Sequence, residues 1–139
     1  MLRIIKLSPI LILMSLFCGC LPTYQIEKGS PATKINVANL GNPMICINGK
    51  KYTLQSSNDY AVVPANQRVT ITNPMTFQSY NMIYNCAPEI SFIPRENKTY
   101  YAHIDVENWQ CQISVFQEGG DNRVGLKLDH TVGRGSCPN

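Results

Sequence analysis

The 139-residue chain lacks most of the patterns that mark a catalytic or metal-binding site. It has only two histidines and no Cys-x-x-Cys pair, which argues against a zinc site. It has no Gly-x-Ser-x-Gly turn either, so the nucleophile elbow of many hydrolases is missing. After residue 20 no segment shows the apolar stripe of a helix, and the apolar run at residues 10–17 is too short to span a bilayer. These absences favour an all-β chain with no cofactor and no metal.

What the sequence does contain is a distinctive start. A basic tip and the apolar run at residues 10–17 precede Gly19 and Cys20, which is the layout of a secretory signal peptide. Residues 16–20 (Leu-Phe-Cys-Gly-Cys) resemble the lipobox of bacterial lipoprotein precursors, in which the cysteine after a small residue is lipidated and becomes the first residue. We therefore expect a signal peptide at residues 1–19 and a lipid on Cys20.

Two cysteines at this start compete for the lipid. Cys20 follows the small Gly19, whereas Cys18 follows the bulky Phe17, so we expect the lipid on Cys20. The alternative is an ordinary signal peptide cut nearby, with Cys20 in a disulfide. The resemblance implies an acyl anchor, such as palmitate chains on a diacylglycerol. Because Leu21, and not an aspartate, follows Cys20, it also implies attachment to the outer membrane, at its periplasmic face.

The mature chain then divides into a tether and a single domain. Residues 20–33 are polar and contain prolines and a glycine, so we expect a lipidated cysteine followed by a flexible tether that spans up to about 40 Å. Residues 34–139 suffice for one domain with a modest core. Loss of the signal peptide removes two of the 12 basic residues, and ten then face 9 acidic ones. This near-neutral balance argues against nucleic acid as a partner.

The domain shows a period of two along most of its length. Apolar residues alternate with polar ones in three clear segments, at residues 69–72, 100–107 and 123–129. This alternation predicts half-buried strands, with Val69 and Ile71 facing the core, and Leu126 and Leu128 likewise.

Turn signals separate these strands at short intervals. Asn48-Gly49, between residues 44–47 and 52–54, is the strongest hairpin signal, because both residues tolerate a positive φ. Regular turns between about eight or nine short strands predict an antiparallel β-sandwich, with a small β-barrel as the alternative.

Four cysteines remain for the domain: Cys46, Cys86, Cys111 and Cys137. An even number in an exported domain predicts two disulfide bonds, and four cysteines allow three pairings.

Strand parity favours one of these pairings. Cys86 shares the parity of Ile90 and Phe92, Cys111 shares that of the next core-facing segment, and we expect residues 99–106 to pair with both segments. Cys86 is then predicted to pair with Cys111, which leaves Cys46 to pair with Cys137 and hold down an otherwise loosely fixed tail at residues 131–139.

Polar neighbours on the predicted strands offer little catalytic chemistry. His103 and Asp105 share the solvent face of one strand, and Ser114 has the same outward parity on the next, so a Ser-His-Asp group is conceivable. Exposed strands produce such neighbours routinely, and we interpret the three as surface residues.

The Gly119-Gly120-Asp121-Asn122 segment lacks the acid spacing of a calcium loop, and we expect a plain turn there.

Aromatic residues are the best candidates for binding. Phe77, Tyr80 and Tyr84 lie in one run with polar neighbours, and Trp109 lies in a predicted turn. Exposed aromatic side chains are good anchors because they contribute a large area with few rotatable bonds. The alternative is that these rings serve packing within the strands.

The sequence as a whole predicts an outer-membrane lipoprotein that acts as a non-catalytic interaction or assembly module of the cell envelope. Its expected partners are the membrane, through the lipid, and other envelope proteins. The likeness to small sandwich lipoproteins of envelope assemblies such as secretion systems is architectural. One alternative is a soluble-ligand binder or an inhibitor of a cell-wall hydrolase, which would insert residues 76–85 into a cleft. A hydrolase that uses His103 is the second alternative.

Overall fold

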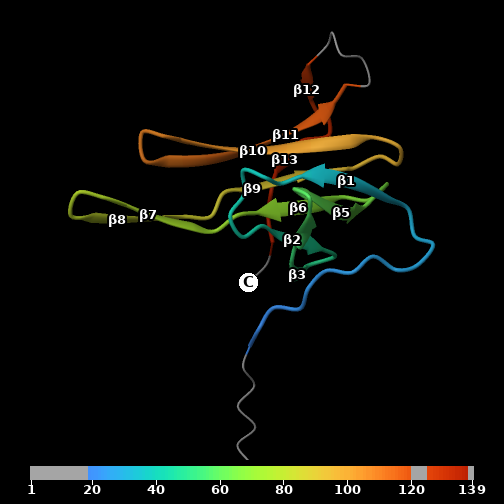
Figure 1. Ribbon diagram of the computed structural model, residues 1–139, viewed down its shortest axis with the longest axis horizontal. Helices are drawn as coiled ribbons and strands as arrows, with labels where there is room; N and C mark the ends of the chain where they lie inside the picture. The colour runs from blue at the N-terminus through green and yellow to red at the C-terminus, as the bar shows by residue number, and fades with distance from the viewer. Residues whose placement is uncertain (1–18, 120–124, 138–139) are drawn as a thin grey trace, which may run out of the picture.

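The structure, a computed structural model, describes residues 19–119 and 125–137. These residues form thirteen β-strands and no α-helix (Figure 1). None of them belongs to a helix long and apolar enough to cross a membrane. Apart from Gly19, the predicted signal peptide lies outside the described residues, and so does the predicted turn at residues 119–122 apart from Gly119.

Eleven strands form two sheets that pack face to face. The six-stranded sheet has the spatial order β12 (Leu126–Leu128), β11 (Gln110–Glu118), β10 (Thr99–Glu107), β1 (Ala32–Asn36), β5 (Tyr60–Pro64) and β4 (Ser56–Ser57). The five-stranded sheet has the order β13 (Gly133–Arg134), β9 (Glu89–Phe92), β6 (Val69–Thr72), β2 (Met44–Ile47) and β3 (Lys50–Thr53). Among the paired strands of the described residues, only β1 and β10 run parallel. The predicted all-β sandwich is confirmed.

The core lies between the two sheets and takes alternate residues from each. Its fully shielded apolar side chains include Ile35, Val63, Tyr100 and Val115 from the larger sheet and Ile45, Ile71 and Phe92 from the smaller one. The rings of Phe92 and Tyr100 meet across the sheets at 5.3 Å. The Tyr100 hydroxyl accepts a hydrogen bond from the Arg95 backbone N–H at 2.9 Å, and burial raises the pKa of this tyrosine.

Two hairpins extend from the sandwich on the same side (Figure 1). The first arm, residues 75–86, consists of β7 (Met75–Ser79) and β8 (Met82–Cys86), which form a sheet of their own. They continue the line of β6 and β9 after breaks that contain Pro74 and Pro88, residues without a backbone N–H for the ladder. The second arm, residues 104–113, is the far end of the β10–β11 hairpin, past the three residues of β10 that pair with β1.

The predicted turn at Asn48-Gly49 is confirmed. Both residues have positive φ, 50° and 76°, and they join β2 to β3 as a two-residue hairpin loop. The chain has more strands than the expected eight or nine, because β4, β12 and β13 have only two or three residues and because the prolines split one long hairpin into β6–β9 and β7–β8.

The predicted pairing of residues 99–106 with both flanking segments is half wrong. The strand β10 pairs with β11 as expected, but β9, which holds Ile90 and Phe92, belongs to the other sheet. The connection at residues 93–98 therefore crosses from one sheet to the other. On its remaining side β10 pairs with β1, which comes from more than sixty positions earlier in the chain.

The expected alternation of β6 is also wrong on its outer face. Thr70 and Thr72 are buried at 6% and 2% exposure, nearly as deeply as the core-facing Val69 and Ile71. Thr70 lies in register with Cys46 on β2, whose side chain is bonded to the C-terminal tail. The tail thus covers a face that local alternation assigns to solvent.

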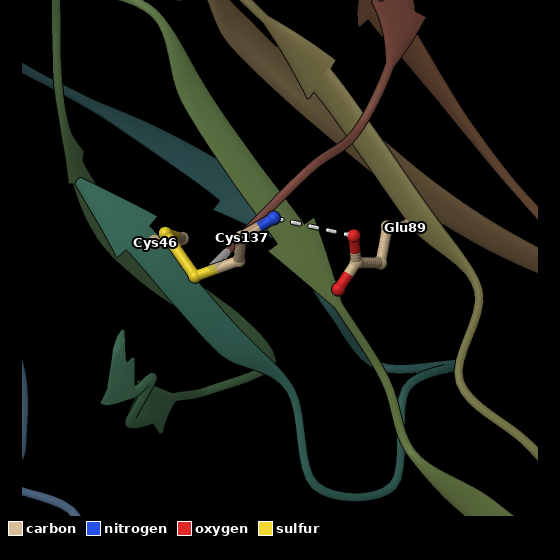
Figure 2. The surroundings of a disulfide bond; sticks show 3 residues. All are labelled: Cys46, Glu89 and Cys137. Carbon is tan, nitrogen blue, oxygen red and sulfur yellow. Dashed lines mark hydrogen bonds between the residues drawn. A yellow bond between two sulfur atoms is a disulfide. The ribbon is translucent and has the colours of Figure 1, made fainter. Parts of the chain in front are cut away.

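The tail follows a fixed path to that point. After β13 pairs with β9, it passes so close to β9 at Gly135 that an added Cβ would lie 2.7 Å from the Cβ of Glu89. Cys137 then bonds to Cys46, and its backbone N–H donates to Glu89 Oε2 at 3.4 Å (Figure 2). This is the Cys46–Cys137 pair that the sequence predicts, and it fixes the tail firmly.

The expected inward direction of Leu126 and Leu128 on β12 is wrong as well. Leu126 and Leu128 are 50% and 57% exposed, because β12 lies outermost in its sheet. Asp129 is buried instead, and its carboxylate accepts hydrogen bonds from the backbone N–H and the hydroxyl of Thr131. These local bonds compensate the carboxylate for the loss of water.

The segment expected to be a free tether contacts the domain near its start. Thr53 at the edge of β3 donates its N–H to the Pro22 carbonyl and accepts from the Tyr24 N–H, both at 2.9 Å. The rings of Tyr24 and Tyr52 also meet edge to face at 5.7 Å. Only Leu21 separates Cys20 from this docked segment, and the domain itself begins at Ala32, two residues before the expected boundary.

Candidate functional site

The two arms hold an aromatic cluster. Phe77 and Tyr84 are directly opposite each other in the first arm, with ring centroids 5.5 Å apart and planes 18° from parallel. Trp109 of the second arm stacks on Tyr84 at 4.1 Å and lies 6.3 Å from Phe77. The structure thus brings together three of the four aromatic residues that the sequence singles out, from segments more than twenty residues apart.

The Cys86–Cys111 disulfide staples the arms together beside this cluster. Cys86 is the last residue of β8 and Cys111 the second of β11, and their Cα atoms are 6.2 Å apart. This is the pair that strand parity predicts. Its role differs from the expectation, because it joins two separate hairpins and does not close one end of a three-stranded meander.

Both arm tips place a bulky aromatic residue in a backbone conformation that suits glycine. Asn108 and Trp109 form the turn of the second arm with φ of 49° and 63°, the same signs as the Asn48-Gly49 turn, and Tyr80 at the tip of the first arm has φ of 52°. A side chain in this left-handed region costs about 1–2 kcal/mol. The chain therefore retains large rings at positions whose backbone conformation glycine would adopt with less strain, a pattern found at functional positions.

The arms carry most of the exposed large apolar side chains in the described residues. The exposed fractions are 95% for Tyr80, 67% for Ile83, 54% for Met82, 54% for Trp109 and 46% for Val106. A group of exposed apolar side chains of this kind marks a contact site, whereas single exposed apolar residues are common on any protein surface.

Three of these residues, Met82, Ile83 and Val106, were missed by sequence reasoning. One signal could have found the first two, since no charged residue occurs between Arg68 and Glu89. Val106 has the parity of the core residues Tyr100 and Ala102 but lies beyond the edge of the sandwich, where parity no longer means burial. The charged residues of the arms are Asp105 and Glu107, both on the second arm.

The residues of the conceivable Ser-His-Asp group do not form a relay. His103 Nε2 lies 3.1 Å from Asp105 Oδ1, so the expected surface pair is present, with side chains 39% and 65% exposed. The other ring nitrogen, Nδ1, lies 3.3 Å from the Tyr101 hydroxyl. Ser114 is opposite His103 in the sheet, but both imidazole nitrogens already face other groups.

A groove lies at the base of the first arm, where the loop before β2 meets the start of β7. It has a volume of about 640 Å³ and no charged residue in its lining, which consists of Gly41, Asn42, Asn73, Pro74, Met75, Thr76, Asn85, Cys86 and Ala87. Asn73 is only 1% exposed, and its Oδ1 accepts a hydrogen bond from the Asn42 N–H at 3.2 Å. That bond fixes the orientation of the amide, and the buried Nδ2 has no partner among the described residues.

Cys20 is exposed. Within residues 19–119 and 125–137 no three histidine, cysteine or acidic side chains come close enough together to hold a metal ion.

Comparison with known proteins adds no relative. No family model, no curated protein and no solved structure matches this chain. Its function is therefore inferred from the geometry of its own residues, of which the stapled aromatic arms are the most distinctive.

Proposed function

We propose that this protein is an outer-membrane lipoprotein, anchored through Cys20, that binds another protein of the cell envelope with its two stapled arms. It is an interaction or assembly module and not an enzyme. The observation that carries the proposal is the pair of exposed aromatic residues, Tyr80 and Trp109, each kept at a positive φ on an arm tip. Neither residue contributes to the core, so contact with a partner accounts for the conformational cost of their positive φ.

The arms have the composition of a binding hot spot. Interface cores are depleted in charge and enriched in tyrosine, tryptophan, phenylalanine and methionine. The first arm has no charged residue and combines Phe77, Tyr80, Met82 and Tyr84, while Trp109 is stacked against it. The staple also fixes the relative position of the arms before binding, which lowers the entropy cost of association.

A partner assay with matched exposed residues tests the arms. Membranes carrying the tagged protein are crosslinked and the tagged protein is purified, from the parent, Trp109→Gly and Leu128→Ala. Leu128, 57% exposed on β12, matches the exposure of Trp109 but lies away from the arms. We expect Trp109→Gly to lose the envelope protein that copurifies with the parent and Leu128→Ala to retain it. Equal recovery from all three contradicts the proposal.

The anchor is tested separately. We expect cells that express the parent to incorporate labelled palmitate into this protein, and Cys20→Ala to abolish the label. Cys18→Ala is the matched control, because it removes the neighbouring cysteine that follows a bulky residue, and it should leave the label unchanged. Label that disappears with Cys18→Ala and persists in Cys20→Ala rules out the assignment.

One alternative keeps support from the structure, namely inhibition of a cell-wall hydrolase. The first arm protrudes and ends in Tyr80 at 95% exposure, which suits insertion into a cleft. In this case the purified protein should slow the digestion of isolated cell walls by the hydrolase it targets. A variant with residues 76–85 replaced by a short glycine turn should lose that effect, and full inhibition by the variant rules this alternative out.

A further inference from the structure

The first arm differs from the outermost strands of the two large sheets in having unprotected edges. Among those outermost strands, β4 and β13 have two residues each, and β12 has three and carries Lys127. The strand β3 carries Lys50 and Lys51 and is covered by the segment at residues 22–24. Short length, charge and cover are the usual means by which proteins prevent edge pairing. The strands β7 and β8 have five uncharged residues each and no further neighbour in the described chain.

The turn at the tip fixes which backbone groups of the arm point outward. A two-residue loop closes with a hydrogen-bonded pair, here Ser79 and Met82, and such pairs alternate along an antiparallel ladder. The backbone N–H and C=O groups of Phe77 therefore point toward β8, where they form hydrogen bonds with Tyr84. On β7 the residues with N–H and C=O groups directed to the open edge are Thr76 and Gln78.

We propose that β7 pairs antiparallel with β7 of a second copy of this chain, about a twofold axis next to Phe77. In that register Thr76 of each copy lies opposite Gln78 of the other, so the outward groups of both strands meet and form four backbone hydrogen bonds. The two Phe77 side chains become cross-strand neighbours on the face that already holds Tyr84 and Trp109. The interface is isologous, as in most homodimers.

The groove at the base of the arm fits this register. Counting outward from the axis places Ser79 of the second copy opposite Met75, and its tip residues Tyr80 and Asn81 beside Pro74 and Asn73. The tip thus reaches the groove that Asn73 lines. The same contact buries Tyr80, the most exposed large apolar residue of the arms.

Charge favours a second copy as the occupant. Residues 69–88 contain no charged side chain, so two such edges meet without like-charge repulsion. Pairing does not depend on the lipid, and the inference therefore goes beyond the proposed function. Where the anchor is present, confinement to one membrane raises the effective concentration of the second copy.

The test is sedimentation equilibrium of the chain from residue 20 with Cys20→Ser and both disulfides intact, at concentrations up to about 1 mM. We expect a reversible monomer–dimer equilibrium. Gln78→Pro removes an outward N–H from each copy, hence two of the four intermolecular bonds, and should raise the dimer Kd about 30-fold. Ile83→Pro also removes an outward N–H, but on the edge of β8. That edge takes no part in the proposed pairing, so the dimer Kd should stay unchanged. Neither proline removes a bond within the hairpin.

A side-chain variant makes the test independent of backbone changes. Tyr80→Ala alters a residue at 95% exposure, so the monomer should keep its far-ultraviolet circular dichroism, while the dimer Kd rises about 10-fold because the tip no longer fills the groove. A chain that stays monomeric over the whole range overturns the proposal. So does a Gln78→Pro chain that dimerises as tightly as the parent, or one whose loss is matched by Ile83→Pro.

Discussion

Removal of the Cys86–Cys111 staple should separate the unfolding of the arms from that of the sandwich. The bond closes a loop with a sequence separation of 25, for which the chain-entropy model gives about 3.5 kcal/mol. What then holds the first arm is the set of ring contacts among Phe77, Tyr84 and Trp109, at about 1 kcal/mol each. An isolated two-stranded hairpin is marginal in water. In the Cys86→Ser/Cys111→Ser variant the arm should therefore open at a low urea concentration.

The chain is well suited to this measurement because Trp109 is its single tryptophan. Its fluorescence reports the arms, whereas far-ultraviolet circular dichroism reports mostly the sheets. In the parent we expect both signals to change together with urea. In the variant the fluorescence transition should come first and the circular dichroism transition should follow at a higher concentration.

The other disulfide provides the control. Cys46–Cys137 closes a separation of 91 and is worth about 4.6 kcal/mol in the same model, but it lies on the sandwich. The Cys46→Ser/Cys137→Ser variant should unfold at a lower urea concentration than the parent, with the fluorescence and circular dichroism transitions still coincident. If fluorescence and circular dichroism stay coincident in the Cys86→Ser/Cys111→Ser variant, the arms are not a separate unit and the reasoning fails.

Three further substitutions give definite outcomes. Trp109→Gly should change the free energy of unfolding by less than about 1 kcal/mol in urea titrations, because relief of the positive φ offsets the lost stacking; a loss above 3 kcal/mol makes Trp109 a core residue. Gly135→Ala should destabilise by about 1–3 kcal/mol, since its Cβ would meet β9, and an unchanged melting temperature contradicts the close passage. Tyr100→Phe should cost about 1–2 kcal/mol at neutral pH by leaving the Arg95 N–H unpaired, and equal stability in urea titration excludes this.

Tyr100 also predicts a dependence on pH. Burial raises its pKa above the ordinary value of 10.0, so the folded state favours the neutral phenol. The contribution of the neutral Tyr100 side chain to the free energy of unfolding is complete below pH 10. It is lost as the pH rises through the raised pKa. The parent should therefore lose stability above pH 10 more steeply than Tyr100→Phe does, as measured by urea titration at several pH values. Parallel profiles contradict the assignment.

Sequence reasoning succeeded where local chemistry decides the structure. The Asn48-Gly49 turn follows from two residues that accept positive φ, and the core side chains of β10 and β11 follow from alternation. The parity of Cys86 and Cys111 also led to the disulfide that places Trp109 on Tyr84.

It failed where distant segments decide. Nothing local to β6 shows that Thr70 faces a tail bonded at Cys137, or that β10 pairs with β1 and not with β9. The groove beside Asn73 exists only because the loop before β2 and the start of β7 meet there. Such features depend on the order of strands in space, which alternation along one strand does not encode.

Photo-crosslinking from the arms in intact cells tests whether the arms contact an envelope protein. A photoreactive phenylalanine replaces Trp109 in one strain and Leu128 in another, two positions of similar exposure on different parts of the surface. We expect an adduct with one envelope protein from position 109, with a mass other than twice that of the chain, and none from position 128. No adduct at position 109, or the same adducts from both positions, contradicts it.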